Sequence, residues 1–249
     1  MKRVWLTLCA VTVFVSACTT ETFPVLIPTA EELIVQNPGA AAERAALVAL
    51  YEATDGANWL SDRPLGAWHG VTTDSAGRVT SLVLTGNRLS GEIPPELGDL
   101  TDLTQLHLEV NELSGSIPPE LGNLTNLTSL DLRFNRLSGE IPSELGNLAR
   151  LNVLALASNR LSGEIPSELG NLTNLTSLDL SSNQLTGPVP ALNNLTSLSW
   201  LNLRGNLLCL PEGAVQSGPN GVAAAHLRSL DLPACAGAQR PQSPATAEG

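Results

Sequence analysis

The sequence contains few aromatic residues and almost no lysine. Phe, Trp and Tyr together make up 3% of the 249 residues, whereas apolar residues of all kinds make up 43%. A single thick core usually needs the volume of aromatic rings. This core must therefore be filled by Leu, Ile and Val, in many thin and similar layers.

Basic residues are scarce in general. Lys and Arg number 13 against 24 Asp and Glu, which gives a net charge of -11, and Lys2 is the only lysine. Such a surface repels nucleic acids and anionic lipid headgroups. We therefore expect no nucleic-acid binding and favour a neutral or cationic partner, although the acidity can equally serve solubility alone.

The motifs that carry most enzyme chemistry are missing. The chain has no phosphate-binding loop, no His-Glu-x-x-His and no zinc-type cysteine spacing. His107, Glu109 and Asp131 are catalytic residue types that we expect to converge, but no nucleophile motif accompanies them. An open face would also exclude water poorly. We therefore expect no enzyme activity, no cofactor and no metal site.

The N-terminus carries an apolar segment that is too short to span a membrane as a stable helix. Two basic residues precede the apolar residues 4–17, in the proportions of a secretory signal. Residues 1–17 are therefore predicted to be a signal peptide. Residues 18–38 contain three prolines and are predicted to form a tether before the folded domain.

The residues before Cys18 resemble a lipoprotein processing site. Val15-Ser16-Ala17-Cys18 is similar to the lipobox of bacterial lipoproteins. The resemblance implies cleavage before Cys18, its lipidation, and an extracytoplasmic place at the bacterial cell envelope. The outer membrane is favoured because Thr19 follows in place of Asp. Two or three acyl chains hold firmly, at roughly 0.8 kcal/mol per buried methylene. The alternative is an ordinary signal peptide that leaves Cys18 as a free thiol.

The four cysteines leave a single pair for the folded domain. Cys9 leaves with the signal peptide and Cys18 takes the lipid, so that Cys209 and Cys235 remain. Two thiols in an oxidising compartment predict one disulfide. Closing this loop is worth roughly 3 kcal/mol in the chain-entropy model.

A repeat of 24 residues occupies residues 79–208. The shared frame is L-x-x-L-x-L-x-x-N-x-L-S-G-x-I-P-x-x-L-G-N-L-x-x, and its asparagine recurs six times: Asn87, Asn111, Asn135, Asn159, Asn183 and Asn206. The L-x-L alternation predicts one short strand per repeat in a parallel sheet. We expect the asparagines to turn inward and form a hydrogen-bonded ladder, because an unpaired buried amide is costly. The prolines favour extended or 3₁₀ return segments.

This frame is typical of leucine-rich repeats, and its L-S-G-x-I-P variant resembles the plant-type class of that family. The resemblance covers roughly residues 43–235. It implies an α/β solenoid, a leucine-rich-repeat superhelix of about six 24-residue repeats with a parallel β-sheet on the concave face. It also implies a second short sheet near each S-G-x-I-P.

Both ends of the solenoid need caps, because an open end exposes the core. Residues 39–78 are predicted to form an N-terminal helical cap, with a helix over 39–54 that places Leu47, Leu50 and Tyr51 on one side. The segment after it resembles the plant-type cap without its cysteine pairs, so Trp59 and Trp68 are expected to close the core by packing.

The C-terminal end has a different predicted cap. Residues 209–235 are expected to form a disulfide-closed C-terminal cap with a helix near 221–230. Residues 236–249 are predicted to be a disordered tail, because they are rich in Pro, Ala, Gly and Gln.

The concave face is the predicted ligand surface. Most of its outward positions carry small residues, but repeats two, three and six carry larger ones: Gln105, His107, Glu109, Val110, Asp131, Arg133, Phe134, Trp200, Asn202 and Arg204. We expect Val110 and Phe134 to expose an apolar spot, with Glu109 beside Arg133 and His107 beside Asp131. Exposed aromatic residues and Arg often dominate binding energy. Cross-strand pairs that only stabilise the sheet are the competing interpretation.

The sequence therefore predicts a membrane-anchored, extracytoplasmic binding module. We expect a monomer that recognises a protein or a polysaccharide and meets the membrane only through its lipid. The alternative is a passive spacer of the cell envelope without a specific ligand, which the small residues of repeats four and five favour.

Overall fold

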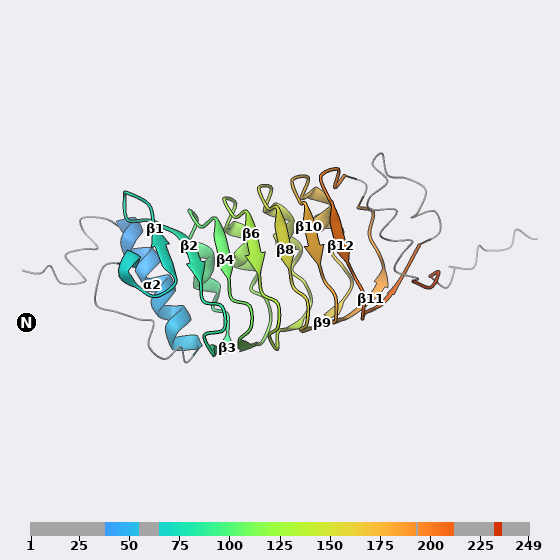
Figure 1. The fold of residues 1–249 in the computed structure, drawn as a ribbon, viewed down its shortest axis with the longest axis horizontal. Helices are drawn as coiled ribbons and strands as arrows, with labels where there is room; N and C mark the ends of the chain where they lie inside the picture. The colour runs from blue at the N-terminus through green and yellow to red at the C-terminus, as the bar shows by residue number, and fades with distance from the viewer. Residues whose placement is uncertain (1–37, 55–64, 193, 212–231, 236–249) are drawn as a thin grey trace, which may run out of the picture. The chain divides into compact units, whose positions relative to one another are not determined.

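The computed structural model of the chain describes residues 38–54, 65–192, 194–211 and 232–235 (Figure 1). The chain divides into two units, residues 1–41 and 42–249, and the second contains the repeats. Several predicted features lie outside the described residues: the signal peptide, Cys18 and its tether, Trp59, the helix near 221–230 and the tail 236–249.

The predicted N-terminal helix is present as α2, Pro38–Ala53. Leu47 and Leu50 are fully buried in the same core as the repeats, and Tyr51 packs against that core. Beyond the last turn, the Thr54 hydroxyl donates to the Leu50 carbonyl oxygen at 2.6 Å. The helix therefore closes the first repeat with apolar side chains, as its spacing predicted.

A short 3₁₀ helix and two strands complete the described part of this cap. Helix η1 is Leu65–Ala67, and strand β1, Val71–Thr73, pairs antiparallel with β2, Val79–Val83. Trp68 is buried in the core, with the Arg44 guanidinium 5.0 Å from its ring centroid. The packing role expected of Trp68 is confirmed.

One seven-stranded sheet runs the length of the repeats in the order β1-β2-β4-β6-β8-β10-β12. From β2 onward every pair is parallel. The repeat strands after β2 are β4 Gln105–His107, β6 Ser129–Asp131, β8 Val153–Ala155, β10 Ser177–Asp179 and β12 Trp200–Asn202. Strands that follow one another in the chain by one repeat are thus neighbours in space, as the period predicted.

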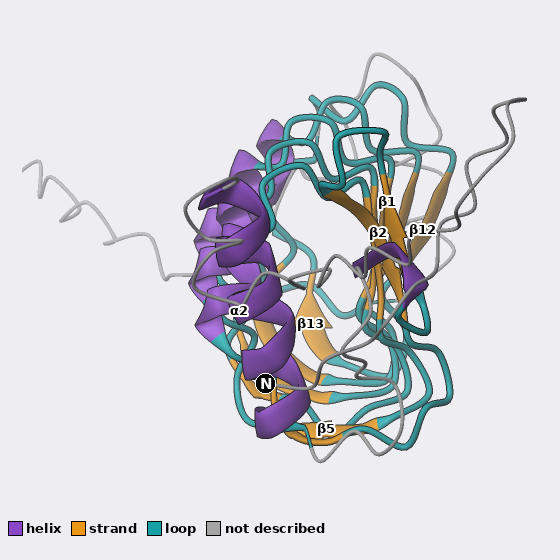
Figure 2. Ribbon diagram, turned by 90° about the vertical axis from the view of Figure 1, so that its left-hand side faces the viewer, coloured by secondary structure: helices purple, strands orange, loops and turns teal. Residues whose placement is uncertain are grey.

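The return paths contain the predicted 3₁₀ segments and second sheets. The helices are η2 Pro95–Asp99, η3 Pro119–Asn123, η4 Ser143–Asn147 and η5 Ser167–Asn171. A two-stranded sheet joins β3 Ser90–Glu92 and β5 Glu112–Ser114, and a four-stranded sheet joins β7 Ser138–Gly139, β9 Arg160–Gly163, β11 Gln184–Pro188 and β13 Leu207–Cys209. Figure 2 shows the helices on one side of the stack and the seven-stranded sheet on the other.

Between these layers the asparagines form the predicted ladder. The Asn135 side-chain amide donates to the carbonyl oxygens of Leu108 and Leu132, and its Oδ1 accepts from the Leu113 amide at 3.0 Å. Equivalent bonds connect every repeat to the one before it, through Asn111, Asn159, Asn183 and Asn206. Asn87 begins the ladder, and its buried Nδ2 has no partner among the described residues.

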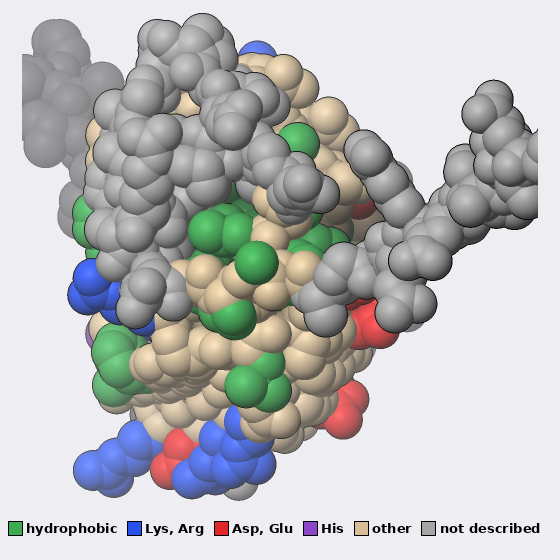
Figure 3. Space-filling view, turned by 90° about the vertical axis from the view of Figure 1, so that its right-hand side faces the viewer, with side chains coloured by type: hydrophobic (Ala, Val, Ile, Leu, Met, Phe, Trp, Pro, Cys, Tyr) green, Lys and Arg blue, Asp and Glu red, His purple; other side chains and the backbone are tan. Residues whose placement is uncertain are grey.

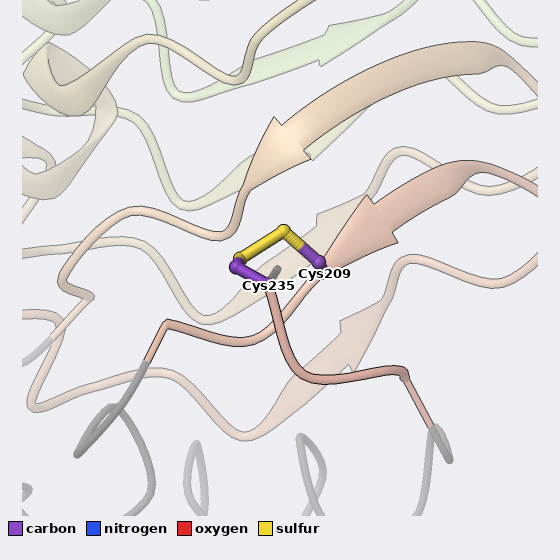
Figure 4. Close-up of a disulfide and its surroundings, with 2 residues drawn as sticks. All are labelled: Cys209 and Cys235. Atoms are coloured by element: carbon purple, nitrogen blue, oxygen red, sulfur yellow. A yellow bond between two sulfur atoms is a disulfide. The ribbon is translucent and has the colours of Figure 1, made fainter. Parts of the chain in front are cut away.

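The predicted disulfide joins Cys209 to Cys235 at the other end of the repeats (Figure 4). Beside it, Leu210 donates to the Pro233 carbonyl oxygen at 2.8 Å, and Cys235 donates back to Leu210 at 2.9 Å. The chain that returns from the C-terminal cap is therefore fixed to the last repeat by one covalent bond and two backbone hydrogen bonds.

Removing one rung of the ladder should destabilise the whole stack. In Asn159→Ala the Leu137 amide loses its acceptor, and the carbonyl oxygens of Leu132 and Leu156 each lose a donor. We expect the free energy of unfolding in urea to fall by about 3 kcal/mol. The matched control Asn147→Ala changes an exposed asparagine and should stay within about 0.5 kcal/mol of the parent. Equal losses in both variants would contradict the ladder as the main constraint.

A second prediction concerns the buried carboxyl of Glu43 in α2. Burial raises its pKa above the ordinary value of 4.5, against an opposing hydrogen bond from the Val79 amide at 3.1 Å. Because the pKa of Glu43 is higher in the folded state, its contribution to stability is complete below pH 4.5. That contribution is lost as the pH rises through the raised value and the buried carboxyl becomes charged. Glu43→Gln keeps an acceptor for Val79 without a charge, so it should be more stable than the parent at pH 7.

The advantage of Glu43→Gln should shrink as the pH is lowered towards 4.5. Urea midpoints measured at several pH values will show this trend. Glu52→Gln is the control, because it removes the same charge from an exposed position of the same helix. A difference from the parent that stays constant with pH would mean that charge burial at Glu43 is not the cause.

Candidate functional site

Each repeat leaves its strand through one residue with a positive φ, immediately before the ladder asparagine. These residues are Gly86 (62°), Val110 (60°), Phe134 (54°), Ser158 (57°), Ser182 (54°) and Gly205 (70°). Glycine adopts this conformation without steric cost, whereas other residues pay roughly 1–2 kcal/mol. A β-branched or bulky residue is a genuine outlier there. We call these six positions the left-handed column.

Val110 and Phe134 are the two large apolar side chains in this column. They are 53% and 54% exposed, so they add little to the core. Val110 donates its amide to Arg133 at 3.0 Å, and Asn111 donates to Phe134 at 3.2 Å, so their backbones lie in adjacent repeats. The apolar pair predicted from the sequence is therefore present, and it occupies backbone positions that oppose it energetically.

The charged residues beside this pair are the ones expected, and Arg133 bonds within its own repeat. Arg133 forms a forked ion pair with Asp131 of its own strand, with Nη2 to Oδ2 at 2.6 Å. That hydrogen bond is the main cause of a raised Arg133 pKa, with smaller contributions from Asp179 and Glu109. Arg133 is therefore already paired on the sheet face.

In repeat two, the polar side chains form their hydrogen bonds with neighbouring repeats. Strand register sets His107 opposite Asp131 as expected, but His107 Nε2 makes its hydrogen bond with the Ser129 hydroxyl at 2.8 Å. Glu109 Oε1 accepts from Thr85 at 2.7 Å, and its buried Oε2 has no partner among the described residues. Gln105 is exposed and accepts from Ser81 at 3.4 Å. Among the described residues, His107 thus bonds to a hydroxyl and not to a carboxylate.

The remaining predicted residues lie apart, on β12. Trp200 is 42% exposed, and Asn202 Oδ1 accepts from the Arg204 amide at 3.3 Å. Three strand spacings of about 4.8 Å, or roughly 14 Å, separate β12 from β6. Figure 3 views the end of the stack beside β12, where apolar side chains gather in the centre and basic ones at the lower edge. The ten predicted residues thus form two groups.

Sequence reasoning missed Asp179 in repeat five. This aspartate is 7% exposed, and its Oδ1 accepts from the Ser181 amide at 3.1 Å and the Ser181 hydroxyl at 2.6 Å. The sequence could have indicated it, because Asp179 holds the same position in its repeat that Asp131 holds in repeat three. The small neighbours Ala155 and Ala157 hid this signal, because they made repeats four and five look featureless.

The described residues contain neither a candidate metal site nor a candidate membrane span. No group of three or more His, Cys, Asp or Glu side chains there is placed to hold a metal ion. No helix within the described ranges is both long and apolar enough to cross a membrane.

Comparisons with known proteins agree on the fold. Residues 78–230 match the family described as leucine-rich repeat region. The comparison with curated proteins gives no match. Among solved structures, the BIR3–SERK2 complex from Arabidopsis thaliana is 31% identical, with a TM-score of 0.61 over 77% of this chain and 98% of that chain.

Two further structures extend the similarity. The BIR2 ectodomain from Arabidopsis thaliana is 36% identical over 66% of this chain and 92% of that chain, with a TM-score of 0.59. The PEPR1–AtPEP1 structure is 32% identical over 68% of this chain and 28% of that chain, with a TM-score of 0.57. Because the family match alone covers more than half of the sequence, the chain belongs to the leucine-rich-repeat family.

Proposed function

We propose that this protein is an extracytoplasmic recognition module that binds a protein partner on the outward face of the seven-stranded sheet. We further propose that a lipid on Cys18 anchors it at the bacterial cell envelope. An open sheet face suits another protein chain as its ligand, whereas a small substrate would need an enclosed pocket. The single observation that carries the proposal is the pair Val110 and Phe134.

The pair is informative because folding alone disfavours it. Glycine or serine fills the other positions of the left-handed column, where small residues cost less. Val110 and Phe134 instead expose more than half of their area next to a paired arginine and aspartate. Exposed apolar side chains rimmed by charge are typical of protein interfaces. A protein partner explains this choice better than a polysaccharide or a passive spacer does.

The structural relatives support the same class of function. Two of them are complexes, BIR3 with SERK2 and PEPR1 with AtPEP1. This likeness favours binding over catalysis. It does not identify the partner, because a fold does not dictate a function. The partner has to be identified by experiment.

The test compares two double variants that relieve the same backbone strain. Val110→Gly with Phe134→Gly removes the apolar pair, and Ser158→Gly with Ser182→Gly changes the same frame position in repeats four and five. The left-handed cost of roughly 1–2 kcal/mol is removed, and glycine loses roughly 0.5–1 kcal/mol in chain entropy. Both variants should therefore unfold at or above the parent's urea midpoint.

Capture of cell-surface proteins on immobilised residues 19–249 gives the functional readout. A protein retained by the parent and by the serine control, but lost by the Val110–Phe134 variant, is the expected result. A polysaccharide retained in the same pattern would keep the site and change the ligand class. Identical retention by all three forms would leave the spacer as the better description. Charge reversal at Arg133 is a poor probe, because it would strand the buried carboxylate of Asp131.

The anchor can be tested separately. In a bacterial host fed an alkyne fatty acid, the parent chain should incorporate the label and enter the membrane fraction. Cys18→Ser should lose both, because the sulfur that accepts the lipid is gone. The Cys209→Ser, Cys235→Ser variant controls for other thiols and should keep the label. Labelling that persists in Cys18→Ser would rule out the lipid anchor at this residue.

A further inference from the structure

Repeats three and five contain the same buried aspartate. Residues 120–132 and 168–180 are identical in sequence. Asp131 and Asp179 are the second-to-last residues of these segments, and one leucine follows each of them. Both aspartates are 7% exposed, and both use Oδ1 to accept a hydrogen bond of 3.1 Å from the backbone amide two residues later. The two repeats thus build the same carboxylate position twice, two strands apart.

The two aspartates differ in the group that faces them. Asp131 receives the Arg133 guanidinium on both of its oxygens. At Asp179 the corresponding residue is Ser181, whose hydroxyl donates to Oδ1 alone, and Oδ2 accepts no hydrogen bond from the described residues. The hydrogen-bond donors of Asp179 are thus all neutral, and the Arg133 guanidinium acts on its charge only from two strands away. A cation in direct contact would offset more of the cost of removing this carboxylate from water.

The residues around Asp179 leave room for such a cation. On one side Ala155 is its partner in register, and on the other side Asn202 lies opposite it. Ala155 is too short to cover the carboxylate, whereas Trp200 lies diagonally across the next strand, within the reach of an aromatic side chain. A partly exposed indole that can turn toward a carboxylate is suited to hold a Lys or Arg side chain.

We propose that Asp179, Trp200 and Asn202 form a subsite for one Lys or Arg side chain of the protein partner. The subsite rests on the proposed function and adds charge recognition to the apolar pair Val110–Phe134. The incoming side chain takes the place that Arg133 takes at Asp131. The net charge of -11 favours a partner that carries such a cation.

The spacing of the two groups constrains the partner further. Strands β6 and β10 lie two strand spacings, or roughly 10 Å, apart, and Phe134 comes three residues after Asp131, the β6 residue in register with Asp179. An extended chain advances about 3.3 Å per residue. A partner segment that crosses the strands would therefore place its apolar and basic anchors at least three residues apart.

The first experiment titrates the intact, ¹⁵N-labelled protein in detergent micelles with Nα-acetyl-arginine methylamide. The Trp200 indole signal and the Asp179 to Ser181 amide signals should shift saturably in NMR spectra. The neutral isostere Nα-acetyl-citrulline methylamide should leave them in place, because it lacks the charge. Equal shifts with both probes, or shifts spread over other acidic positions, would overturn the subsite.

Two variants test the same point from opposite sides. Asp179→Asn removes the charge, and Ser181→Arg supplies the cation from within, as repeat three does, so both should lose the saturable shift. Glu168→Gln removes one negative charge from an exposed 3₁₀ position and should keep it. Ser181→Arg remains decisive if Asp179→Asn folds poorly. Binding that survives in Ser181→Arg would overturn the proposal.

The capture assay separates this inference from the proposed function. Loss of the retained protein in Ser181→Arg, beside loss in the Val110–Phe134 variant, supports both. If only the Val110–Phe134 variant loses the protein, the subsite is wrong and the recognition module stands. If the arginine probe binds but every variant retains the same proteins, the module is wrong although the carboxylate binds cations.

Discussion

The inward asparagine of each repeat is the interaction on which the rest of the structure depends. A chain that leaves a parallel strand and turns back across the core exposes backbone groups that no ladder of strands can satisfy. Asn135 satisfies the Leu113 amide and the Leu108 and Leu132 carbonyls with one side chain, and so connects two repeats. Because each asparagine amide must reach groups of two repeats, every repeat makes the same turn at this position. The left-handed column follows from that turn, since the residue before each asparagine has to reverse the chain.

This constraint separates what the frame requires from what it merely permits. Leucines and asparagines are required: the leucines are buried in every repeat, and the asparagines are buried or half-buried. The column before the asparagine requires only a residue that tolerates positive φ, which Gly86 and Gly205 do at no steric cost. Val110 and Phe134 are neither buried like the leucines nor tolerant of positive φ like glycine. Their side chains are exposed, and their residue types are disfavoured at positive φ. Stability therefore gives no account of them, whereas the proposed contact with a protein partner does.

The sequence predicted those features that the frame repeats, and it did less well on those that depend on a single side chain. Strands, 3₁₀ returns and the ladder each follow from local spacing, so six copies made them predictable. The second sheets were implied by the resemblance to plant-type repeats. The partner of Arg133 does not, because Glu109 and Asp131 both lie within its reach and only the rotamer decides between them. The disulfide followed from counting cysteines. The lipid anchor stays a prediction, since Cys18 lies outside the described residues.

A repeat protein also supplies its own comparison, because copies of one sequence meet different neighbours. Thirteen identical residues give Asp131 and Asp179 the same local sequence. The two repeats differ only after these residues, with Arg133 in repeat three and Ser181 in repeat five. If the carboxylate served only to accept the amide two residues on, an asparagine would do so without the cost of burying a charge. At Asp131 the arginine offsets that cost within the chain. At Asp179 the corresponding residue is Ser181, and Arg133 acts on the carboxylate only from two strands away, so the proposed subsite takes its cation from the partner that binds the sheet.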